Sequence, residues 1–426
     1  MLKKRSLLLW VLLSVALMAG LLVQAASKNL EVWIMQTGNP AGAEKMMAEV
    51  NKEFTKANRG VKVNVSWIPW TGAQQKFLTS IVGGMAPDIA ELGTTWNPDF
   101  AAMGALEDLG PYVEKWGYGA DLLPALKESA TYEDRLYGLP WYAGNRSIYY
   151  RKDWFDEAGI KEFPTTWEDF IKVAVKMTKD TDGDGKIDRF GFSVNGASQH
   201  EFLPLIWMNG GEIAVKTEKG WKSTIDTPES RQALQALADL YLKHKVSQEG
   251  SVTWNVLSSR KAFETGSQAM IIDVAPLVPK FLENPNLKDK FAMAPLPYLK
   301  KPASFIGGSN LVMFTQSKKK DLAWKYLELM LSAKYQMAWS EAVSFFPARV
   351  SLLEDPKFNK DPYLSVFTQQ MKYGRVYPAI PQWGQVENSR ILLKMMQQIM
   401  MGKMSVEQAT TEAAKTMNII FGYSED

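Results

Sequence analysis

The chain has 426 residues, more than one hydrophobic core supports, so two or more domains are expected. Its 46% hydrophobic and 22% charged residues are typical of a globular protein and exclude a disordered or fibrous chain. There is no cysteine, which excludes disulfides, thiolate metal sites and cysteine nucleophiles. The net charge of +3 arises within the first 25 residues, and the balanced remainder gives no reason to expect a nucleic-acid partner.

The first 25 residues have the features of a secretory signal peptide. Lys3, Lys4 and Arg5 precede an apolar run over 7–23, and small residues stand before the expected cleavage after Ala25. The alternative is an uncleaved membrane anchor, because the run approaches the length that spans a bilayer. No cysteine is present to carry a lipid, so we expect a cleaved, exported chain in the periplasm.

Strand and helix patterns alternate in the first part of the mature chain. Strands are expected at 30–35, 61–67 and 88–92, with helices at 40–58 and 72–82. This order predicts a doubly wound parallel sheet, in which ligands bind beyond the carboxyl ends of the strands. Those ends carry Gln36 and Thr37, Trp70, and Thr95 and Trp96.

The middle of the chain predicts a second unit. The expected strands and helices are a strand near 147–150, a helix opened by Thr166, a helix from Thr227, and strands at 269–273 and 306–314. The last hundred residues are expected to be mainly helical, over 318–332, 334–341, 386–401 and 405–420. No low-complexity linker separates the units, so we expect the chain to cross between them several times.

One local motif resembles a calcium-binding loop. Asp180, Asp182, Asp184 and Asp188 stand at positions 1, 3, 5 and 9 of an EF-hand pattern that has glycine at position 6. Position 12 is Gly191, where a bidentate glutamate is expected. The motif therefore indicates either a structural Ca²⁺ site or a tight turn that needs no metal.

The 15 tryptophans fall into two groups. Those within strand or helix patterns are interpreted as core residues: Trp33, Trp67, Trp167 and Trp324. Others stand in predicted loops or at element ends, beside glycines and polar residues: Trp70, Trp96, Trp141, Trp207, Trp254 and Trp383. Several such rings at strand ends predict a cleft with an aromatic floor and a polar rim.

A cleft of this kind fits a sugar. A pyranose presents a face of C–H groups, which an indole covers, and a rim of hydroxyls, which polar side chains and backbone groups satisfy. Burying about 100 Å² of apolar surface on one ring contributes roughly 2–3 kcal/mol before association costs. Two or three stacked rings therefore support roughly micromolar binding.

A catalytic role is disfavoured by the motifs. The sequence has no phosphate-binding loop, dinucleotide glycine fingerprint, G-x-S-x-G elbow or H-E-x-x-H motif. A glycosidase needs only two suitably spaced carboxylates, for which Glu91, Asp273 and Glu387 are candidates. A chain with 46 acidic residues always offers such a choice, so we expect no catalytic residue.

Several stretches together resemble the solute-binding proteins of bacterial ABC importers, in the maltodextrin-binding branch (extracellular solute-binding family 1). The stretches are Ala86-Pro87-Asp88-Ile89 with 100–109, Tyr137-Gly138-Leu139-Pro140-Trp141 with 149–155, Ala262-Phe263-Glu264-Thr265-Gly266 with Ala269-Met270, and Gly307-Gly308-Ser309-Asn310. The resemblance covers nearly the whole mature chain.

The resemblance implies an α/β clamp of the periplasmic-binding-protein type, each lobe a doubly wound sheet flanked by helices. It places lobe 1 at 27–147 and 296–314, lobe 2 at 148–295 and 315–426, and three hinge crossings near 147–150, 293–297 and 314–317. A carbohydrate held between the lobes favours the closed form. The closed monomer then docks on a transmembrane permease whose ATPase supplies the energy, and no cofactor is required.

The tryptophan pattern and the resemblance together give the expected ligand-binding residues. They are Gln36, Thr37, Trp70, Thr95, Trp96, Trp141, Tyr142, Gln199, His200, Trp207, Asn209, Asp273, Gly308, Ser309, Arg349 and Trp383. For His200, a loop or core role is an open alternative to ligand contact.

Two departures from the family pattern argue against a plain maltose specificity. Val274-Ala275-Pro276 replaces a stacking aromatic after Asp273, and Leu92 stands where maltodextrin binders stack a tryptophan. Trp383 is the expected replacement platform. Two alternatives stay open: the same clamp holding a polyol or a glycerol-phosphate-type solute, with Arg146 and Arg349 as candidate anion ligands, and an exported glycoside-acting enzyme.

Overall fold

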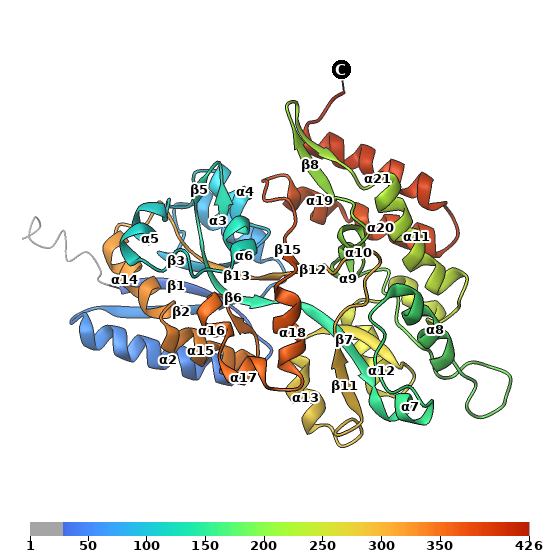
Figure 1. Cartoon of the computed structure of the whole chain (residues 1–426). Coiled ribbons are helices and arrows are strands. Elements are labelled where there is room, and N and C mark those ends of the chain that lie inside the picture. Colours follow the sequence, from blue (N-terminus) through green and yellow to red (C-terminus); the bar gives the residue numbers. More distant parts are fainter. Residues whose placement is uncertain (1–28, 426) are drawn as a thin grey trace, which may run out of the picture.

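The computed structural model describes residues 29–425 and forms two lobes side by side (Figure 1). The expected signal peptide lies outside the described residues. Within residues 29–425, no helix combines the length and apolar character needed to cross a membrane.

The first lobe is built on a six-stranded mixed sheet with the order β14-β6-β13-β3-β1-β2. The strands are β1 (Asn29–Met35), β2 (Lys62–Ile68), β3 (Ile89–Gly93), β6 (Leu139–Gly144), β13 (Gly307–Met313) and β14 (Phe346–Pro347). β1 pairs in parallel with both β2 and β3, as the sequence predicts. β13 and β6 extend the sheet with antiparallel pairs, which makes it mixed rather than wholly parallel.

Helices cover both faces of this sheet. They are α2 (Pro40–Ala57), α3 (Ala73–Val82), α4 (Asn97–Ala102), α5 (Gly110–Trp116), α6 (Pro124–Ser129), α14 (Lys320–Met330) and α15 (Ala333–Val343). α2 begins where the sequence predicts: Pro40 occupies the first turn, and the Asn39 side chain accepts a hydrogen bond from the Gly42 backbone N–H at 3.2 Å. Its predicted stripe, which includes Val50 and Phe54, is buried against the sheet.

The second lobe has a smaller sheet, in which β7 (Arg146–Arg151) lies between β10 (Met270–Val274) and β11 (Phe291–Ala294). Both pairs are antiparallel, so the doubly wound pattern expected for this lobe is replaced by a three-stranded antiparallel sheet. The helices around it are α7 (Lys152–Glu157), α8 (Trp167–Met177), α9 (Gln199–Phe202), α10 (Pro204–Met208), α11 (Pro228–Leu242), α12 (Val256–Glu264), α13 (Leu277–Glu283), α19 (Trp383–Ser389), α20 (Ile391–Met400) and α21 (Val406–Phe421).

Short elements complete the chain. Three two-stranded ladders join β4 (Thr131–Tyr132) to β5 (Arg135–Leu136), β8 (Ala214–Thr217) to β9 (Gly220–Ser223), and β12 (Ser304–Phe305) to β15 (Gly374–Arg375). The remaining helices are the 3₁₀ turn η1 (Glu249–Thr253), α16 (Val350–Leu353), α17 (Pro356–Asn359) and α18 (Leu364–Met371).

The helices α14 and α15 belong to the first lobe, which corrects the assignment of everything after 315 to the second. The Tyr326 hydroxyl of α14 donates to the Asn51 side-chain oxygen of α2 at 2.6 Å, and its ring meets Phe54 edge-on at 5.0 Å. In α15, the Ala342 carbonyl accepts from the Asn39 side chain at 2.9 Å. Helical periodicity showed that these helices exist, but it carries no information about which lobe covers their apolar faces.

The chain crosses between the lobes at three places. The first crossing is at Asn145, between β6 and β7, close to the predicted 147–150. The second runs from the end of β11 to β13 and includes the predicted 293–297. The third follows α18 and leads through β15 to α19, so the prediction of a crossing at 314–317 is wrong.

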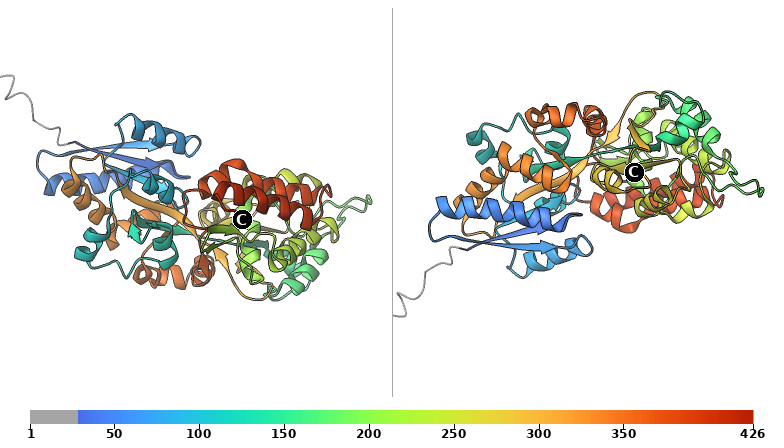
Figure 2. Two further views of the ribbon diagram at one scale, coloured as in Figure 1. Left: turned by 90° about the horizontal axis from the view of Figure 1, so that it is seen from above. Right: turned by 90° about the horizontal axis from the view of Figure 1, so that it is seen from below.

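The hinge side of the molecule is a packed core shared by both lobes. Leu123 and Phe346 of the first lobe join Tyr149 and Phe291 of the second in one buried cluster, which α18 completes through Phe367. The Asn145 side chain donates to the Phe367 carbonyl at 2.9 Å and fixes the first crossing to α18. Figure 2 shows the two lobes from above and from below.

Candidate functional site

A cavity of about 370 Å³ lies between the two lobes. Its first-lobe wall comes from strand ends and the loops that follow them: Trp70, Gly93, Thr94, Thr95, Trp96, Tyr142, Gly144, Gly307, Gly308 and Phe345. Its second-lobe wall comes from the start of β7, α9, the end of β10, β12 and α19: Arg146, His200, Val274, Phe305 and Glu387. The cavity therefore occupies the place that the strand-end pattern predicts.

Glycines open the floor of this cavity. Gly308 has φ +148°, and a Cβ at this position would lie 2.0 Å from the Tyr142 carbonyl oxygen. A Cβ at Gly144 would lie 2.9 Å from the Phe345 ring. A side chain at Gly308 would force β13 away from β6, and one at Gly144 would displace the Phe345 ring, so the two glycines keep the floor open.

Trp70 and Trp96 form an aromatic pair at the first-lobe side of the cavity. Their ring centroids are 5.7 Å apart with 59° between the planes. The Trp70 indole N–H donates to the Gln36 carbonyl at 3.0 Å, which anchors the ring while 43% of the residue stays exposed. A Cβ on Gly93 would lie 3.4 Å from the Trp70 ring, so the glycine allows the ring to lie close against the end of β3.

A second cavity, of about 590 Å³, adjoins the first. Trp70, Trp96 and Glu387 line both cavities, and the second continues between α3 and α19 along Gln74, Asp99 and Asn388. The lobes meet at its edge, where the Asn388 side chain donates to the Gln74 side-chain oxygen at 3.4 Å. The cleft is thus an extended groove with the tryptophan pair at its middle.

An aromatic stack forms the second-lobe wall. The His200 ring lies parallel to Phe305 with centroids 4.7 Å apart, and its Nδ1 is 2.8 Å from the Tyr377 hydroxyl. Burial lowers the pKa of His200 well below its usual value, and the positive charge of Arg146 lowers it further. His200 is therefore a neutral wall residue that contacts both the core and the cavity.

Glu387 is the acidic group of the cleft. Its carboxylate accepts a hydrogen bond from the Gln199 side chain at 2.9 Å, which links α19 to α9. Burial raises the pKa of Glu387, and polar contacts with Thr95 and Gln199 partly offset this effect. The sequence offered Glu387 only as one of three candidate carboxylates for a glycosidase and not among the ligand-binding residues, because its place within a predicted helix gave no sign that this helix borders the cleft.

A buried carboxyl group supports the cleft floor from below. The Tyr142 hydroxyl donates to Glu91 at 2.7 Å and accepts from Ser309 at 2.9 Å, and the Met35 backbone N–H donates to Glu91 at 2.9 Å. Burial raises the pKa of Glu91 to about 7, although these hydrogen bonds oppose the shift. The network fixes the Tyr142 ring, which stacks on Phe345 with centroids 5.1 Å apart.

Three of the predicted tryptophans do not line the cleft, and those predictions are wrong. Trp141 is fully buried and stacks on Trp339 with centroids 4.1 Å apart. Trp207 and Trp383 are buried in the core of the second lobe, where both pack against Tyr377. Their polar and glycine neighbours in the sequence indicated loop positions, whereas in the structure each ring lies in the core of its lobe.

Three predicted polar ligands are also wrong, because each already has partners within its own lobe. Asp273 is fully buried and makes a bidentate pair with Arg260, both distances being 2.9 Å. Arg349 pairs with Asp121 at 2.7 Å in the first lobe. Asn209 donates to the Glu229 carbonyl at 2.7 Å, at the end of α10.

Most of the remaining predicted residues are in or beside the cleft. Trp70, Thr95, Trp96, Tyr142, His200 and Gly308 line the cavity. Gln199 and Ser309 lie behind the cavity wall, where Gln199 donates a hydrogen bond to Glu387 and Ser309 donates one to Tyr142. Gln36 holds Trp70 through its carbonyl, and the Thr37 hydroxyl accepts from the Asn39 backbone N–H at 3.2 Å, so neither side chain lines a cavity.

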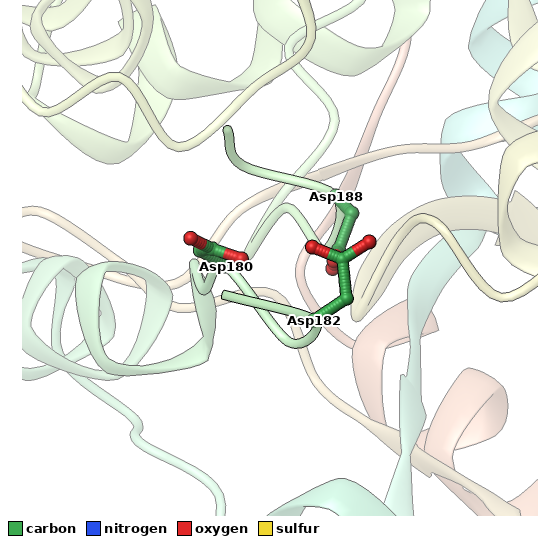
Figure 3. Close-up of side chains that lie close together, drawn as sticks. All are labelled: Asp180, Asp182 and Asp188. Atoms are coloured by element: carbon green, nitrogen blue, oxygen red, sulfur yellow. The ribbon is translucent and has the colours of Figure 1, made fainter. Parts of the chain in front are cut away.

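The Asp180–Asp188 loop projects from the second lobe beyond α8 (Figure 1), and Figure 3 shows the side chains of Asp180, Asp182 and Asp188 close together. Carboxylate oxygens of Asp180, Asp182 and Asp188 lie within 4.8 Å of one another. Asp180 accepts from the Gly183 and Gly185 backbone N–H groups, at 2.7 and 2.8 Å, and these bonds lower its pKa. A Cβ at Gly191 would lie 1.9 Å from the Ala174 carbonyl, so no glutamate fits at position 12, and the calcium site stays a prediction.

Comparison with known proteins identifies the family. Residues 38–337 match the family model described as bacterial extracellular solute-binding protein. The chain is 28% identical to the diacetylchitobiose binding protein DasA of Streptomyces coelicolor, over 85% of this chain and 83% of that protein.

Solved structures have the same fold. The solute-binding protein of a Thermotoga lettingae ABC transporter, bound with α-D-tagatose, is 29% identical with a TM-score of 0.78, covering 93% of this chain and all of that one. The sugar-binding protein MalE of Xanthomonas citri is 26% identical with a TM-score of 0.81, covering 92% and 97%. The chain therefore belongs to the bacterial extracellular solute-binding protein family, as its sequence motifs, its two lobes and its interlobe cleft indicate.

Proposed function

We propose that this protein captures a sugar in the interlobe cleft and delivers it to the transmembrane permease of an ABC importer. The observation that carries the proposal is the tryptophan pair, Trp70 and Trp96, which lines a groove whose other walls present polar groups from both lobes. Indole rings cover the C–H face of a pyranose, and Thr95, Glu387 and Arg146 are placed to meet its hydroxyl groups.

The length of the groove supports an oligosaccharide. Two cavities of about 370 and 590 Å³ adjoin at the tryptophan pair, so sugar rings on both sides can contact the same indoles. Relatives support this reading by name: besides the diacetylchitobiose binding protein, they include an arabinooligosaccharide-binding protein and a galactooligosaccharide-binding protein.

Closure of the lobes supplies the transport signal. Ligand contacts from both walls stabilise the closed form, as the Asn388–Gln74 contact across the groove does in part. The closed monomer then presents both lobes to the permease, whose ATPase drives import. Export to the periplasm with cleavage after Ala25 belongs to the same proposal.

One observation bears on the polyol alternative: an erythritol/L-threitol-binding protein matches over 38% of this chain. A glycoside-acting enzyme has less support, because among the three candidate carboxylates only Glu387 lines the cleft. Glu91 lies beneath the floor, and Asp273 is paired with Arg260.

The test is a titration of the purified mature protein with a panel of polyols, monosaccharides and oligosaccharides. Tryptophan fluorescence and calorimetry measure the binding. We expect micromolar or tighter binding of at least one oligosaccharide, with a fluorescence change from Trp70 and Trp96, and no product release on prolonged incubation. Binding of a polyol alone, or repeated turnover of an oligosaccharide, contradicts the proposal.

A further inference from the structure

Arg146 is the charged residue of the cleft that has no partner of its own. It is the first residue of β7, directly after the crossing at Asn145, and its side chain lines the interlobe cavity. Its Nε is buried without a hydrogen-bond partner, and no ion pair to its side chain is present among residues 29–425. Its backbone carbonyl, in contrast, accepts from the Gln370 side chain at 3.0 Å.

The other arginines of comparable burial are all neutralised by a carboxylate. Arg151 pairs with Asp153 at 2.5 Å, Arg260 with Asp273 at 2.9 Å, and Arg349 with Asp121 at 2.7 Å. Each of these three arginines thus has a carboxylate within ion-pair distance, whereas Arg146 has none among residues 29–425.

Glu387, the acid in the same cavity, does not take this role. It accepts from Gln199 at 2.9 Å, and its pKa reflects burial and contacts with Thr95 and Gln199. The charge of Arg146 acts on buried groups of the second lobe: it adds to the effect of burial in lowering the pKa of His200, and it opposes burial, which raises the pKa values of Glu201 and Asp273. Neither carboxylate lies within ion-pair distance of Arg146 among residues 29–425. Arg146 and Glu387, which both line this cavity, therefore form no ion pair with each other.

Closure of the clamp determines which ligand groups the unpaired Arg146 guanidinium favours. In an open clamp water solvates Arg146, and closure on a ligand removes that water. A neutral sugar then offers only hydroxyl oxygens, whereas a carboxylate offers two charged acceptors that match the guanidinium fork. An anionic ligand therefore stabilises the closed state more than its neutral counterpart does.

We infer that the ligand of this cleft is an acidic saccharide, in which a carboxylate of the uronic acid type binds the Arg146 side chain. This inference rests on the proposed sugar-binding function and names the substrate class of that site. A phosphate group has the same attraction for a guanidinium, so the test separates the two sources of negative charge.

The experiment measures affinities by calorimetry for ligand pairs that differ only in the acid group. The saccharide pairs are glucose with glucuronate, galactose with galacturonate, and the corresponding disaccharides, and a further pair is glycerol with glycerol 3-phosphate. We expect the uronate of at least one saccharide pair to bind at least about tenfold more tightly than the neutral sugar, with a preference that weakens at high salt.

Variants identify the residue responsible. Arg146→Gln should abolish the preference for the acid, and Arg146→Lys should retain part of it, since a lysine keeps the charge but loses the fork. Arg59→Gln, which removes an exposed arginine between α2 and β2, should leave it unchanged. Melting temperatures show that each variant is folded.

Three outcomes overturn the inference. If neutral sugars bind as tightly as uronates, or if Arg146→Gln weakens both members of a pair equally, Arg146 binds sugar hydroxyl groups and not a carboxylate. The proposed sugar-binding function is then retained. If glycerol 3-phosphate binds and no saccharide does, the sugar-binding function itself fails.

Discussion

The indole of Trp383 packs against the ring of Tyr377 with centroids 4.8 Å apart and 29° between the planes. Tyr377 in turn places its hydroxyl 2.8 Å from His200 Nδ1, and His200 lines the cleft. A tryptophan that the sequence offered as a sugar platform is therefore a core residue that supports the cleft wall from behind.

Replacing Trp383 should therefore affect stability first. We expect Trp383→Ala to lower the free energy of unfolding by about 3–5 kcal/mol, because it removes a fully buried indole from the second-lobe core. Urea unfolding of the two proteins measures the difference. An unchanged stability with a tenfold loss of sugar affinity would instead place the ring in the site, as the sequence pattern predicted.

Replacing Trp96 should reduce sugar affinity and leave stability nearly unchanged. Trp96 is half-buried, lines both cavities and meets Trp70 at 5.7 Å, so Trp96→Ala removes stacking surface without opening the core. We expect sugar affinity to fall at least about tenfold, with a small change in melting temperature. Half-buried Trp116, at the end of α5 beside Tyr118, lines neither cavity, and Trp116→Ala should leave affinity intact. Equal losses in the two variants would contradict the placement of the site.

Stability should fall as the pH rises from about 4.5 to 7. Burial raises the pKa of Glu91 to about 7 and that of Glu201 to about 7, so these two carboxyl groups bind more protons in the folded protein than in the unfolded chain in this window. Each group thus contributes a penalty of about 3 kcal/mol that is absent at low pH and complete above pH 7. His200, whose pKa burial lowers, acts in the opposite direction and offsets part of the slope.

Thermal unfolding at a series of pH values measures this dependence. Glu91→Gln and Glu201→Gln should each remove part of the slope, and the double variant should remove more than either alone. The Glu201 carboxyl accepts from Ser198 at 2.6 Å and from Asn195 at 2.8 Å. The Glu201→Gln variant therefore also shows how much these hydrogen bonds at α9 contribute to stability. A slope that survives in the double variant would assign the pH dependence to other groups.

Removal of calcium should leave sugar binding intact. The Asp180–Asp188 loop lies beyond α8, away from the cleft, and hydrogen bonds such as Thr181 N–H to Asp188 at 3.0 Å hold its conformation. We expect equal sugar affinities with excess EDTA and with Ca²⁺. Melting temperatures under the same two conditions test the site itself, since a bound ion stabilises the folded state by mass action. A sugar affinity that depends on Ca²⁺ would contradict the separation of loop and cleft.

Much of the fold follows from local patterns. The strand-helix alternation predicted β1, α2, β2, α3 and β3 within two residues at each end, because apolar periodicity and capping are properties of neighbouring residues. One predicted helix over 386–401 is divided in the structure, because Arg390 has φ +57° and separates α19 from α20. No local sequence pattern predicts that break, because arginine is ordinarily a good helix former.

The sequence by itself determined the lobed α/β class, the strand ends that carry Trp70 and Trp96, and the family, since these depend on spacing along the chain. Only the tertiary structure decided which tryptophans line the cleft, that α14 and α15 cover the first sheet, and that the Arg146 side chain forms no ion pair among residues 29–425. Each of these depends on residues that lie far apart in the sequence, such as Trp141 and Trp339, which stack in the folded protein although no periodic pattern in the sequence connects them.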